Sequence, residues 1–225
     1  MIRNAHCVRD SPNFLILGAS GSIGAACAEK LQPIGTVTHG SKNLAHLSRQ
    51  IASFPKFDGV IWAQGVNLAD SLPTFEVDSF EGVLEANLTF VLRSLKVLIE
   101  SKKIQSDSQL VVLSSIWGQL SRPNKLSYGI SKAAVGGMVR SLAVDLGPMG
   151  IQINSVSPGP VDTPMTIKNL SPGEMERIIS ETPLKRLVNL SEVASVVCEL
   201  ATGKLSGVTG QDIIVDSGWS VAKLV

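Results

Sequence analysis

The stretch that decides the fold is Phe14-Leu-Ile-Leu-Gly-Ala-Ser-Gly-Ser-Ile-Gly24. Its first four residues form a short, continuous apolar run, which is typical of a strand buried on both faces of a parallel sheet. The apolar residues from Ile23 onward are spaced as in a helix, and Pro33 with Gly35 ends that helix. The stretch therefore predicts a strand, a glycine-rich turn and a helix in immediate succession.

The rest of the chain repeats this alternation of strand and helix. Apolar runs predict further strands at residues 36–39, 58–63, 109–114, 151–156 and 212–215, and helical spacing predicts helices at 80–101, 126–146 and 191–201. Neighbouring parallel strands need a crossover connection, which the helices supply. We therefore predict an α/β protein, a Rossmann-type three-layer αβα sandwich built on a doubly wound parallel sheet.

Length and composition indicate one globular domain. With 225 residues, of which 44% are hydrophobic and 17% charged, the chain can bury a large core. We expect a single domain over 1–225 that opens with a polar lead-in at 1–12. The net charge of +1 provides no broad attraction to nucleic acid or to an anionic membrane. The longest apolar stretch, at 90–99, contains Arg93 and Lys96 and is too short to span a bilayer.

The cysteines and histidines predict no metal site. Cys7, Cys27 and Cys198 lie far apart and lack the spacing of a zinc site or a disulfide framework. His39 and His46 have no partners at metal-ligand spacing, so we expect surface or capping roles for them. A reducing, cytoplasmic location fits this cysteine usage best.

The turn Gly18-Ala-Ser-Gly-Ser-Ile-Gly24 is a candidate phosphate-binding loop. Ligands of parallel sheets bind beyond the carboxyl ends of the strands, where this turn is predicted to lie. Small residues let the backbone approach a pyrophosphate, and the following helix offers unpaired N–H groups with a partial positive charge. A plain glycine-rich turn would have the same composition, so the motif alone leaves both interpretations open.

Tyr128-Gly-Ile-Ser-Lys132 contains the only tyrosine of the chain, four residues before a lysine. Residues with this spacing share one face of a helix. A nearby ammonium favours the phenolate and lowers the tyrosine pKa, which prepares the phenol for proton exchange at neutral pH. Ser115, 13 residues upstream and at the end of a predicted strand, can hydrogen-bond the oxygen that exchanges its proton with Tyr128. A solvated helix face is the usual meaning of such a pair, and the combination with Ser115 and the glycine turn favours catalysis instead.

These motifs together resemble the short-chain dehydrogenase/reductase family, in the compact type that includes 3-oxoacyl-carrier-protein reductases. The resemblance covers most of the chain and includes Asn87 in Glu-Ala-Asn-Leu, the segment Pro158-Gly-Pro-Val-Asp-Thr163 and the closing segment Gly210-Gln-Asp-Ile-Ile-Val-Asp-Ser-Gly218. It implies an NAD(P)-dependent oxidoreductase that interconverts a carbonyl and a secondary alcohol of a small molecule by hydride transfer.

The resemblance also implies roles for individual residues. Tyr128 would be the general acid/base, Ser115 would anchor the substrate oxygen, and Lys132 would hold the nicotinamide ribose. Asn87 would hold a water that links Lys132 to solvent, and an asparagine that fills a helix kink is an equally good interpretation. The expected cofactor contacts, with no metal ligand among them, are Gly18, Ser20, Ser22, Ile23, Gly24, Ser41, Lys42, Ala63, Gly65, Tyr128, Lys132, Pro158, Gly159, Val161 and Thr163.

The sequence departs from the family pattern at three places. Ser22 stands where the family has its middle glycine, with Gly21 one place earlier. Trp62-Ala-Gln-Gly65 replaces the family's Asn-Asn-Ala-Gly, which removes two asparagines that brace neighbouring strands. The connection from Thr38 to Val60 is much shorter than in the family, so the third-strand region is shortened. We expect a vestigial third strand at Leu44-Ala-His-Leu47 rather than a direct return through one helix.

Charge indicates the cofactor. An acid after the second strand would bind the ribose hydroxyls of NAD and repel the extra phosphate of NADP. Between Glu29 and Asp58 there is no acid, whereas four basic residues, Lys42 among them, lie in that interval. NADP(H) is therefore favoured, with NAD(H) possible if Lys42 only solvates a loop.

Three further expectations concern the substrate lid, the assembly and an alternative function. Residues 164–183 are a candidate substrate lid, although their apolar stripe equally suits a helix packed on the core. The resemblance implies a homo-oligomer, either a dimer or a tetramer, built on the helices at 80–101 and 126–146 and on the carboxyl-terminal strand. Small residues such as Gly136 and Gly137 permit close approach of the helices. A catalytically silent dinucleotide-binding redox sensor is the alternative function, and an intact set of Asn87, Ser115, Tyr128 and Lys132 argues against it.

Overall fold

The computed structural model describes residues 11–222, except the side chains of Met165, Lys168 and Asn169. Positions 1–10, which hold most of the predicted lead-in and Cys7, and positions 223–225 lie outside the described residues. The description below refers to this part of the chain.

The described residues form a six-stranded parallel sheet with the order β2-β1-β3-β4-β5-β6. Because every strand runs in the same direction, each connection must cross over the sheet, and helices make most of these crossovers. The strand bounds are Asn13–Leu17 (β1), Thr36–Gly40 (β2), Phe57–Trp62 (β3), Ile104–Leu113 (β4), Gln152–Pro158 (β5) and Asp212–Val215 (β6).

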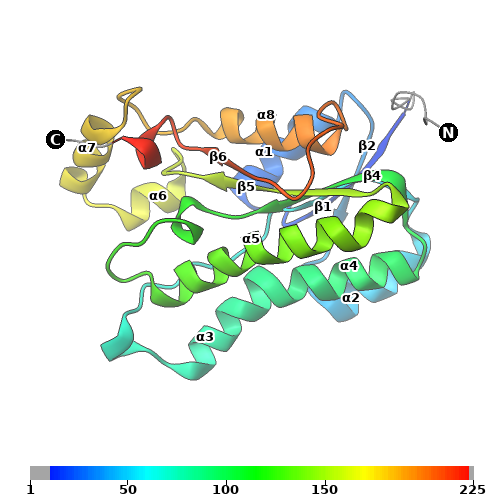
Figure 1. The fold of residues 1–225 in the computed structure, drawn as a ribbon, viewed down its shortest axis with the longest axis horizontal. Coiled ribbons are helices and arrows are strands. Elements are labelled where there is room, and N and C mark those ends of the chain that lie inside the picture. Colours follow the sequence, from blue (N-terminus) through cyan, green and yellow to red (C-terminus); the bar gives the residue numbers. More distant parts are fainter. Residues whose placement is uncertain (1–10, 223–225) are drawn as a thin grey trace.

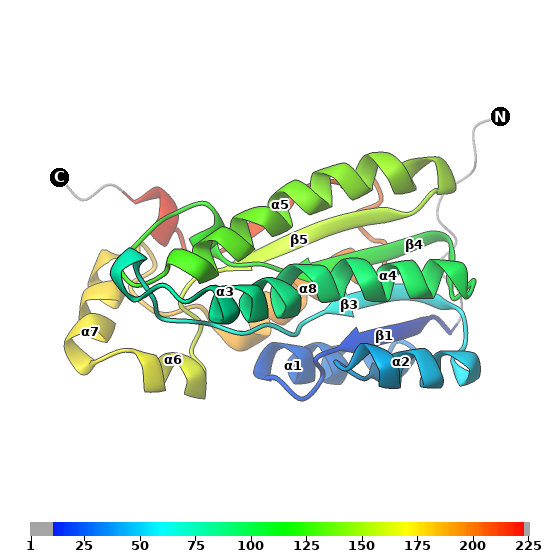
Figure 2. The ribbon, with the colours of Figure 1, turned by 90° about the horizontal axis from the view of Figure 1, so that it is seen from below.

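Helices cover both faces of the sheet, which confirms the predicted three-layer sandwich (Figures 1 and 2). On one face lie α1 (Ser22–Leu31) and α8 (Leu190–Ala201), and on the other lie α2 (Leu44–Gln50), α4 (Phe90–Glu100) and α5 (Leu126–Leu146). α3 (Val77–Leu84) leads into α4, while α6 (Pro164–Asn169) and α7 (Pro172–Glu181) lie beyond the carboxyl end of β5.

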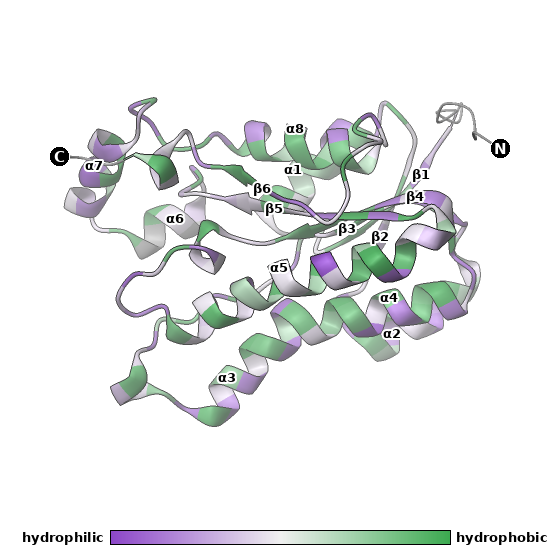
Figure 3. Cartoon of the chain, viewed as in Figure 1, coloured by the Kyte–Doolittle hydropathy of each residue, from purple (hydrophilic) through white to green (hydrophobic). Residues whose placement is uncertain are grey.

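The strand side chains alternate between two hydrophobic cores. In β1, Leu15 and Leu17 face the core under α2, α4 and α5, while Phe14 and Ile16 face the core under α1 and α8. All four side chains are fully buried, so β1 reads as a continuous apolar run because it is covered on both faces. Figure 3 shows hydrophobic residues along β3 and on the helices of both faces, while hydrophilic residues gather in α7.

The expected third strand at Leu44–Leu47 is wrong. These residues begin α2, and the Asn43 side chain caps that helix by accepting a hydrogen bond from the His46 N–H (3.0 Å). Leu47 is fully buried against the core under α4, so the local apolar pattern belongs to a short amphipathic helix. One helix therefore returns directly from β2 to β3, and β2 becomes an edge strand with His39 exposed.

Strand register brings the carboxyl ends of the inner strands to one edge. Leu17 of β1 pairs with Trp62 of β3, and Trp62 pairs with Val112 of β4. The turns after these three strands therefore lie side by side. They contain the glycine turn, the segment 63–70 and Ser115.

Candidate active site

Helix α5 carries Tyr128 and Lys132 on one face, one turn apart. The Lys132 ammonium lies 5.8 Å from the centre of the Tyr128 ring. Gly118, in the turn after β4, packs so closely on this helix that a Cβ there would lie 2.7 Å from the Lys132 backbone carbonyl. The glycine thereby lets Ser115, at the start of that turn, lie against the face of α5 that carries Tyr128.

Ser115 and Tyr128 are brought together as the sequence predicted. Burial raises the pKa of Tyr128 above its ordinary value of 10, and its hydrogen bond with Ser115 opposes that rise. The expected lowering of this pKa by Lys132 is not found in this structure; burial is the larger cause, and Ser115 is the residue that lowers the pKa. Tyr128 is therefore a neutral phenol at pH 7, which is the form that can donate a proton.

Lys132 is a buried cation with one hydrogen-bond acceptor. Its side chain is 4% exposed, and Nζ donates a hydrogen bond to the Leu113 carbonyl at the end of β4 (2.9 Å). Burial lowers the pKa of this ammonium from 10.5 to about 8, since the low-dielectric interior disfavours the charged form. Lys132 can therefore exchange a proton close to physiological pH.

Asn87 lies in a π-helical turn, Glu85–Thr89, that separates α3 from α4 and interrupts the predicted helix at 80–101. Its Oδ1 accepts from the Val66 N–H (2.8 Å), and its Nδ2 donates to the Val66 carbonyl (3.0 Å) and to Ser131 Oγ (2.9 Å). A Cβ on Gly65 would lie 3.1 Å from Asn87 Oδ1 and 3.5 Å from Lys132 Nζ. Asn87 thus connects the loop after β3 with the helix that carries the tyrosine, and π-helical turns frequently occur at functional sites.

Asp70 is a site residue that sequence reasoning missed. Its carboxylate, 5% exposed, accepts hydrogen bonds from the backbone N–H (3.0 Å) and the hydroxyl of Ser127, and its carbonyl accepts from the Leu126 N–H (3.2 Å). Lys125, the local cap position of α5, makes no side-chain cap. Asp70 therefore caps α5 from a distant loop, one residue before Tyr128, and no local capping pattern in the sequence could indicate it.

The glycine turn has the geometry of a phosphate cradle. Gly18 has a φ of +94°, and a Cβ there would lie 2.5 Å from the Gln64 N atom. A Cβ on Gly24 would lie 2.3 Å from the Gly18 carbonyl oxygen, so both positions require glycine. Helix α1 starts at Ser22, and its cap residue Gly21 supplies no side-chain hydrogen bond. The first N–H groups of α1 are therefore open to an anion.

Trp62 and Gln64 lie in the segment that replaces the family's asparagine pair. Trp62 is fully buried and donates from Nε1 to Ser94 Oγ on α4 (2.8 Å), so the brace runs to a helix rather than to a neighbouring strand. Both polar atoms of the Gln64 amide are buried and have no hydrogen-bond partner among the described residues. Native structures rarely leave such groups unpaired, and these lie in the residue whose backbone touches Gly18.

The segment after β5 lies at the same edge of the sheet. Gly159 donates from its N–H to the Val215 carbonyl of β6 (2.9 Å), and Val161 forms a bridge with Val188. Thr163 caps α6 through its hydroxyl, which accepts from the Thr166 N–H (3.3 Å). This segment therefore leads the chain from the sheet edge, at Pro158, into the candidate lid.

The sequence comparisons decide the family. The model of the family described as enoyl-(acyl carrier protein) reductase matches residues 37–220. The 3-oxoacyl-(acyl-carrier-protein) reductase FabG of Rickettsia felis is 30% identical over 91% of this chain and 95% of its own length. The chain is a short-chain dehydrogenase/reductase. FabG of Salmonella typhimurium is 28% identical over the same shares of both chains.

Solved structures agree with the fold of this short-chain dehydrogenase/reductase. A short-chain dehydrogenase/reductase of Brucella melitensis, described as a glucose/ribitol dehydrogenase, is 26% identical, covers 92% of this chain and 96% of its own, and has a TM-score of 0.85. A gluconate 5-dehydrogenase of Burkholderia cenocepacia, solved with NADP and tartrate, has a TM-score of 0.87 at 20% identity, with coverage of 96% and 97%.

Features of this structure fit the nicotinamide dinucleotide that the family implies. The Gly18 and Gly24 cradle has no room for a Cβ, and the unpaired Gln64 amide lies beside it. Ser41 and Lys42 follow the carboxyl end of β2, next to β1 in the sheet, and the Lys42 side chain is exposed. The residues expected to hold the two ends of a dinucleotide therefore lie along one edge of the sheet.

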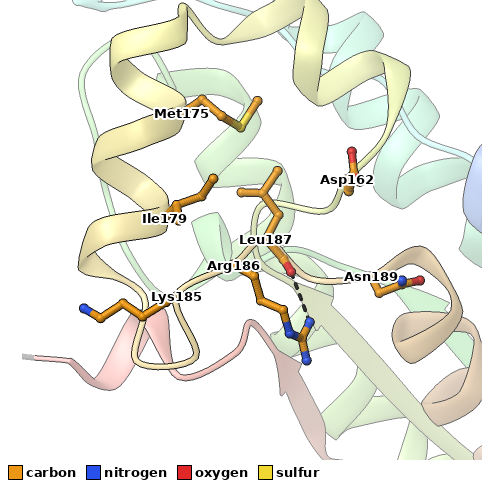
Figure 4. A pocket seen from close by; sticks show the side chains of 7 residues that line it. All are labelled: Asp162, Met175, Ile179, Lys185, Arg186, Leu187 and Asn189. Carbon is orange, nitrogen blue, oxygen red and sulfur yellow. Dashed lines mark hydrogen bonds between the residues drawn. The ribbon is translucent and has the colours of Figure 1, made fainter.

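The candidate lid, residues 164–183, consists of α6, α7 and the start of the loop that follows. A cavity of about 440 Å³ lies between α7 and that loop, lined by Asp162, Met175, Ile179, Lys185, Arg186, Leu187 and Asn189 (Figure 4). Arg186 forms a bidentate ion pair with Glu192 in the first turn of α8 (2.8 and 2.7 Å). None of the four expected catalytic residues lines this cavity.

Two kinds of feature are absent from the described part of the chain. Residues 11–222 contain no group of three or more histidine, cysteine or acidic side chains that could hold a metal ion. Within the same residues, no helix has the length and apolar character needed to cross a bilayer.

Proposed function

We propose that this short-chain dehydrogenase/reductase reduces the carbonyl of a small molecule to a secondary alcohol with NADPH, and catalyses the reverse reaction with NADP+. The observation that carries the proposal is the convergence of Ser115, Tyr128 and Lys132 at the sheet edge that also bears the glycine cradle. A protein that only senses the dinucleotide has no use for a proton donor beside a hydroxyl anchor.

Proton transfer is the part of the reaction that this chain performs. The bound nicotinamide supplies the hydride. Ser115 holds the substrate oxygen by a hydrogen bond, and Tyr128 donates the phenolic proton to that oxygen as negative charge develops on it. Because burial keeps the phenol neutral at pH 7, the proton is present when it is needed.

Lys132 and Asn87 return the proton to Tyr128. The Lys132 ammonium stabilises the phenolate that is left after the transfer, and its pKa of about 8 allows it to give up and regain a proton readily. Asn87 borders the same space through Gly65, and we assign it the water that connects Lys132 with solvent. The same ammonium would also hold the nicotinamide ribose.

Charge at the sheet edge supports a preference for NADP(H). No acid lies between Glu29 and Asp58, and Lys42 follows β2 at the position where an acid would repel a 2′-phosphate. Titration with NADPH and NADH, followed by nicotinamide fluorescence, tests this preference. We expect tighter binding of NADPH and a loss of that difference in Lys42→Glu, with Lys204→Glu, exposed after α8, as control. Equal affinities in the wild-type protein would remove the charge argument.

The reaction itself is tested by a panel of ketones and aldehydes with both reduced cofactors. We expect oxidation of NADPH that depends on the carbonyl compound. Binding of NADPH without turnover of any carbonyl compound would instead favour the redox-sensor alternative.

The remaining assignments concern the surroundings of the site. We propose that the single domain closes over its substrate with residues 164–183, that it acts in the cytoplasm, and that it assembles as a homotetramer or a dimer through α4 and α5. Exposed apolar side chains on these helices, Leu92 (41%) and Val144 (76%), support the assembly. Above Gly136 and Gly137 only the tip of Arg140 would meet an added Cβ, which leaves room for a partner helix.

A further inference from the structure

We propose that the substrate carries an anionic group, a carboxylate or a phosphate, and that Arg122 and Lys125 bind this group while the carbonyl faces Tyr128. This inference rests on the proposed function and specifies its substrate class. It is carried by two cations held beside the reacting tyrosine without an acidic partner.

Arg122 and Lys125 flank one tight turn that leads into α5. Asn124 has a φ of +59°, a left-handed conformation that asparagine tolerates, and it reverses the chain between the two cations. Both side chains are half-buried rather than extended into solvent. The turn thus holds two positive charges close to the amino end of the catalytic helix.

Aromatic rings hold each cation near the site. The Arg122 guanidinium lies 5.4 Å from the centre of the Trp117 ring, two residues after Ser115, and that ring contacts Trp219 edge-on at 5.6 Å. The Lys125 ammonium lies 5.4 Å from the centre of the Tyr128 ring and donates to Asn67 Oδ1 (2.6 Å). Attraction between cation and ring holds Lys125 against the Tyr128 ring and holds Arg122 against Trp117, two residues after Ser115.

Neither of the two cations has an ion-pair partner among the described residues, a condition that some other exposed cations, such as Lys42 and Arg140, share. Arg93 pairs with Glu85 at 3.1 Å and Lys204 with Glu199 at 2.8 Å, whereas within residues 11–222 no carboxylate lies within ion-pair distance of Arg122 or Lys125. Burial and the charge of Arg122 lower the pKa of Lys125, and Asp70 offsets only part of this effect. An anion bound between Arg122 and Lys125 would relieve their repulsion.

The nearby acids are already engaged. Asp70 is occupied by Ser127, as described above. Glu174, at the start of α7, accepts from the N–H (2.9 Å) and the hydroxyl (2.8 Å) of Ser171 in a capping box. These hydrogen bonds lower the pKa of Glu174, with Arg122 as a smaller influence. The Glu174 carboxylate of the lid therefore lies within electrostatic range of Arg122 but does not form an ion pair with it.

The test uses pairs of probes in which one member carries an anionic group and the other is a neutral compound with the same carbonyl. The carboxylate pairs are 4-oxopentanoate with its methyl ester and 2-oxohexanoate with its methyl ester, and the phosphate pair is dihydroxyacetone phosphate with dihydroxyacetone. The measured quantity is the ratio of kcat/KM for the charged probe to that for the neutral probe, with NADPH. It is compared among the wild-type protein, Arg122→Gln, Lys125→Gln and the control Lys204→Gln, whose lysine follows α8.

We expect the wild-type ratio for at least one pair to favour the anion about tenfold or more, since a charge-assisted hydrogen bond contributes this much. Arg122→Gln and Lys125→Gln should each lower that ratio about tenfold, mainly through KM, and Lys204→Gln should leave it unchanged. The pair that responds distinguishes a carboxylate from a phosphate. If neutral and charged probes are reduced equally well, the inference is overturned while the proposed reaction stands.

A binding measurement covers the case in which none of these probes is reduced. Calorimetric titration of the protein with NADP+ bound, using the hydroxy-acid and glycerol-phosphate products of the charged probes, should detect binding that Arg122→Gln weakens. Absence of anion binding at millimolar concentration, or binding that both variants retain, overturns the inference.

Discussion

Replacing Lys132 with methionine should stabilise the protein while it removes activity. Lowering the pKa of this lysine from 10.5 to about 8 by burial corresponds to about 3 kcal/mol of destabilisation at neutral pH. Methionine fills a similar volume without a charge. The loss of the hydrogen bond to the Leu113 carbonyl offsets part of the gain, by about 1–3 kcal/mol.

The pH dependence separates the charge from the lost hydrogen bond. Between pH 8 and 10.5 the unfolded wild-type chain binds a proton at Lys132 that the folded state has released, so wild-type stability rises with pH in this window. The stability advantage of Lys132→Met should therefore shrink by about 2 kcal/mol between pH 7 and 9.5. The hydrogen-bond contribution should not produce this change.

Urea unfolding of both proteins at pH 7 and 9.5, at one protein concentration, measures the difference. Lys204→Met, at an exposed ion pair, is the control and should show no such pH dependence. A difference between Lys132→Met and wild type that is constant from pH 7 to 9.5 would refute the claim that burial of this ammonium costs stability.

Three further predictions follow from the site and the helix surfaces. Asp70→Ala should destabilise the protein by about 1–3 kcal/mol and lower turnover, because Ser127 loses its hydrogen-bond partners at the start of α5. Asp145→Ala, exposed on the same helix, is the control and should change neither stability nor turnover. Equal melting temperatures of the two variants would contradict the capping role of Asp70. Alcohol oxidation should rise about tenfold per pH unit between pH 6 and 8, because burial raises the pKa of Tyr128 and the phenolate is scarce, and a flat profile would contradict this assignment. Light scattering should give a multiple of the chain mass of 23.8 kDa, whereas a monomer would exclude the proposed assembly.

The sequence predicted the elements whose signals are local. A continuous apolar run indicates β1 because this strand is covered on both faces. Tyr128 and Lys132 share one face of α5 because residues four apart do so in any α-helix. The predicted third strand at Leu44–Leu47 was wrong because an apolar segment of this length fits either a strand or one side of a helix. The packing of Leu47 against the core selects the helix.

The parts of the site that sequence could not predict depend on distant contacts. Asp70 caps α5 through Ser127, which is 57 positions away in the sequence, and Trp62 donates a hydrogen bond to Ser94, 32 positions away. The pKa of Tyr128 also depends on tertiary contacts: burial raises it and the hydrogen bond with Ser115 lowers it, whereas the helical spacing had suggested an effect of Lys132. The sequence motif thus identifies the residues of the site, while tertiary packing determines their protonation states before the reaction.

Turnover by Tyr128→Phe tests the central claim most directly. The substitution removes one oxygen from α5 and leaves the glycine cradle and Lys132 in place. With a carbonyl compound that the wild-type protein reduces, we predict a loss of about 10²–10⁴ in kcat, the usual contribution of general acid catalysis, with unchanged affinity for NADPH. Retention of wild-type kcat by Tyr128→Phe would contradict the assignment of Tyr128 as the proton donor.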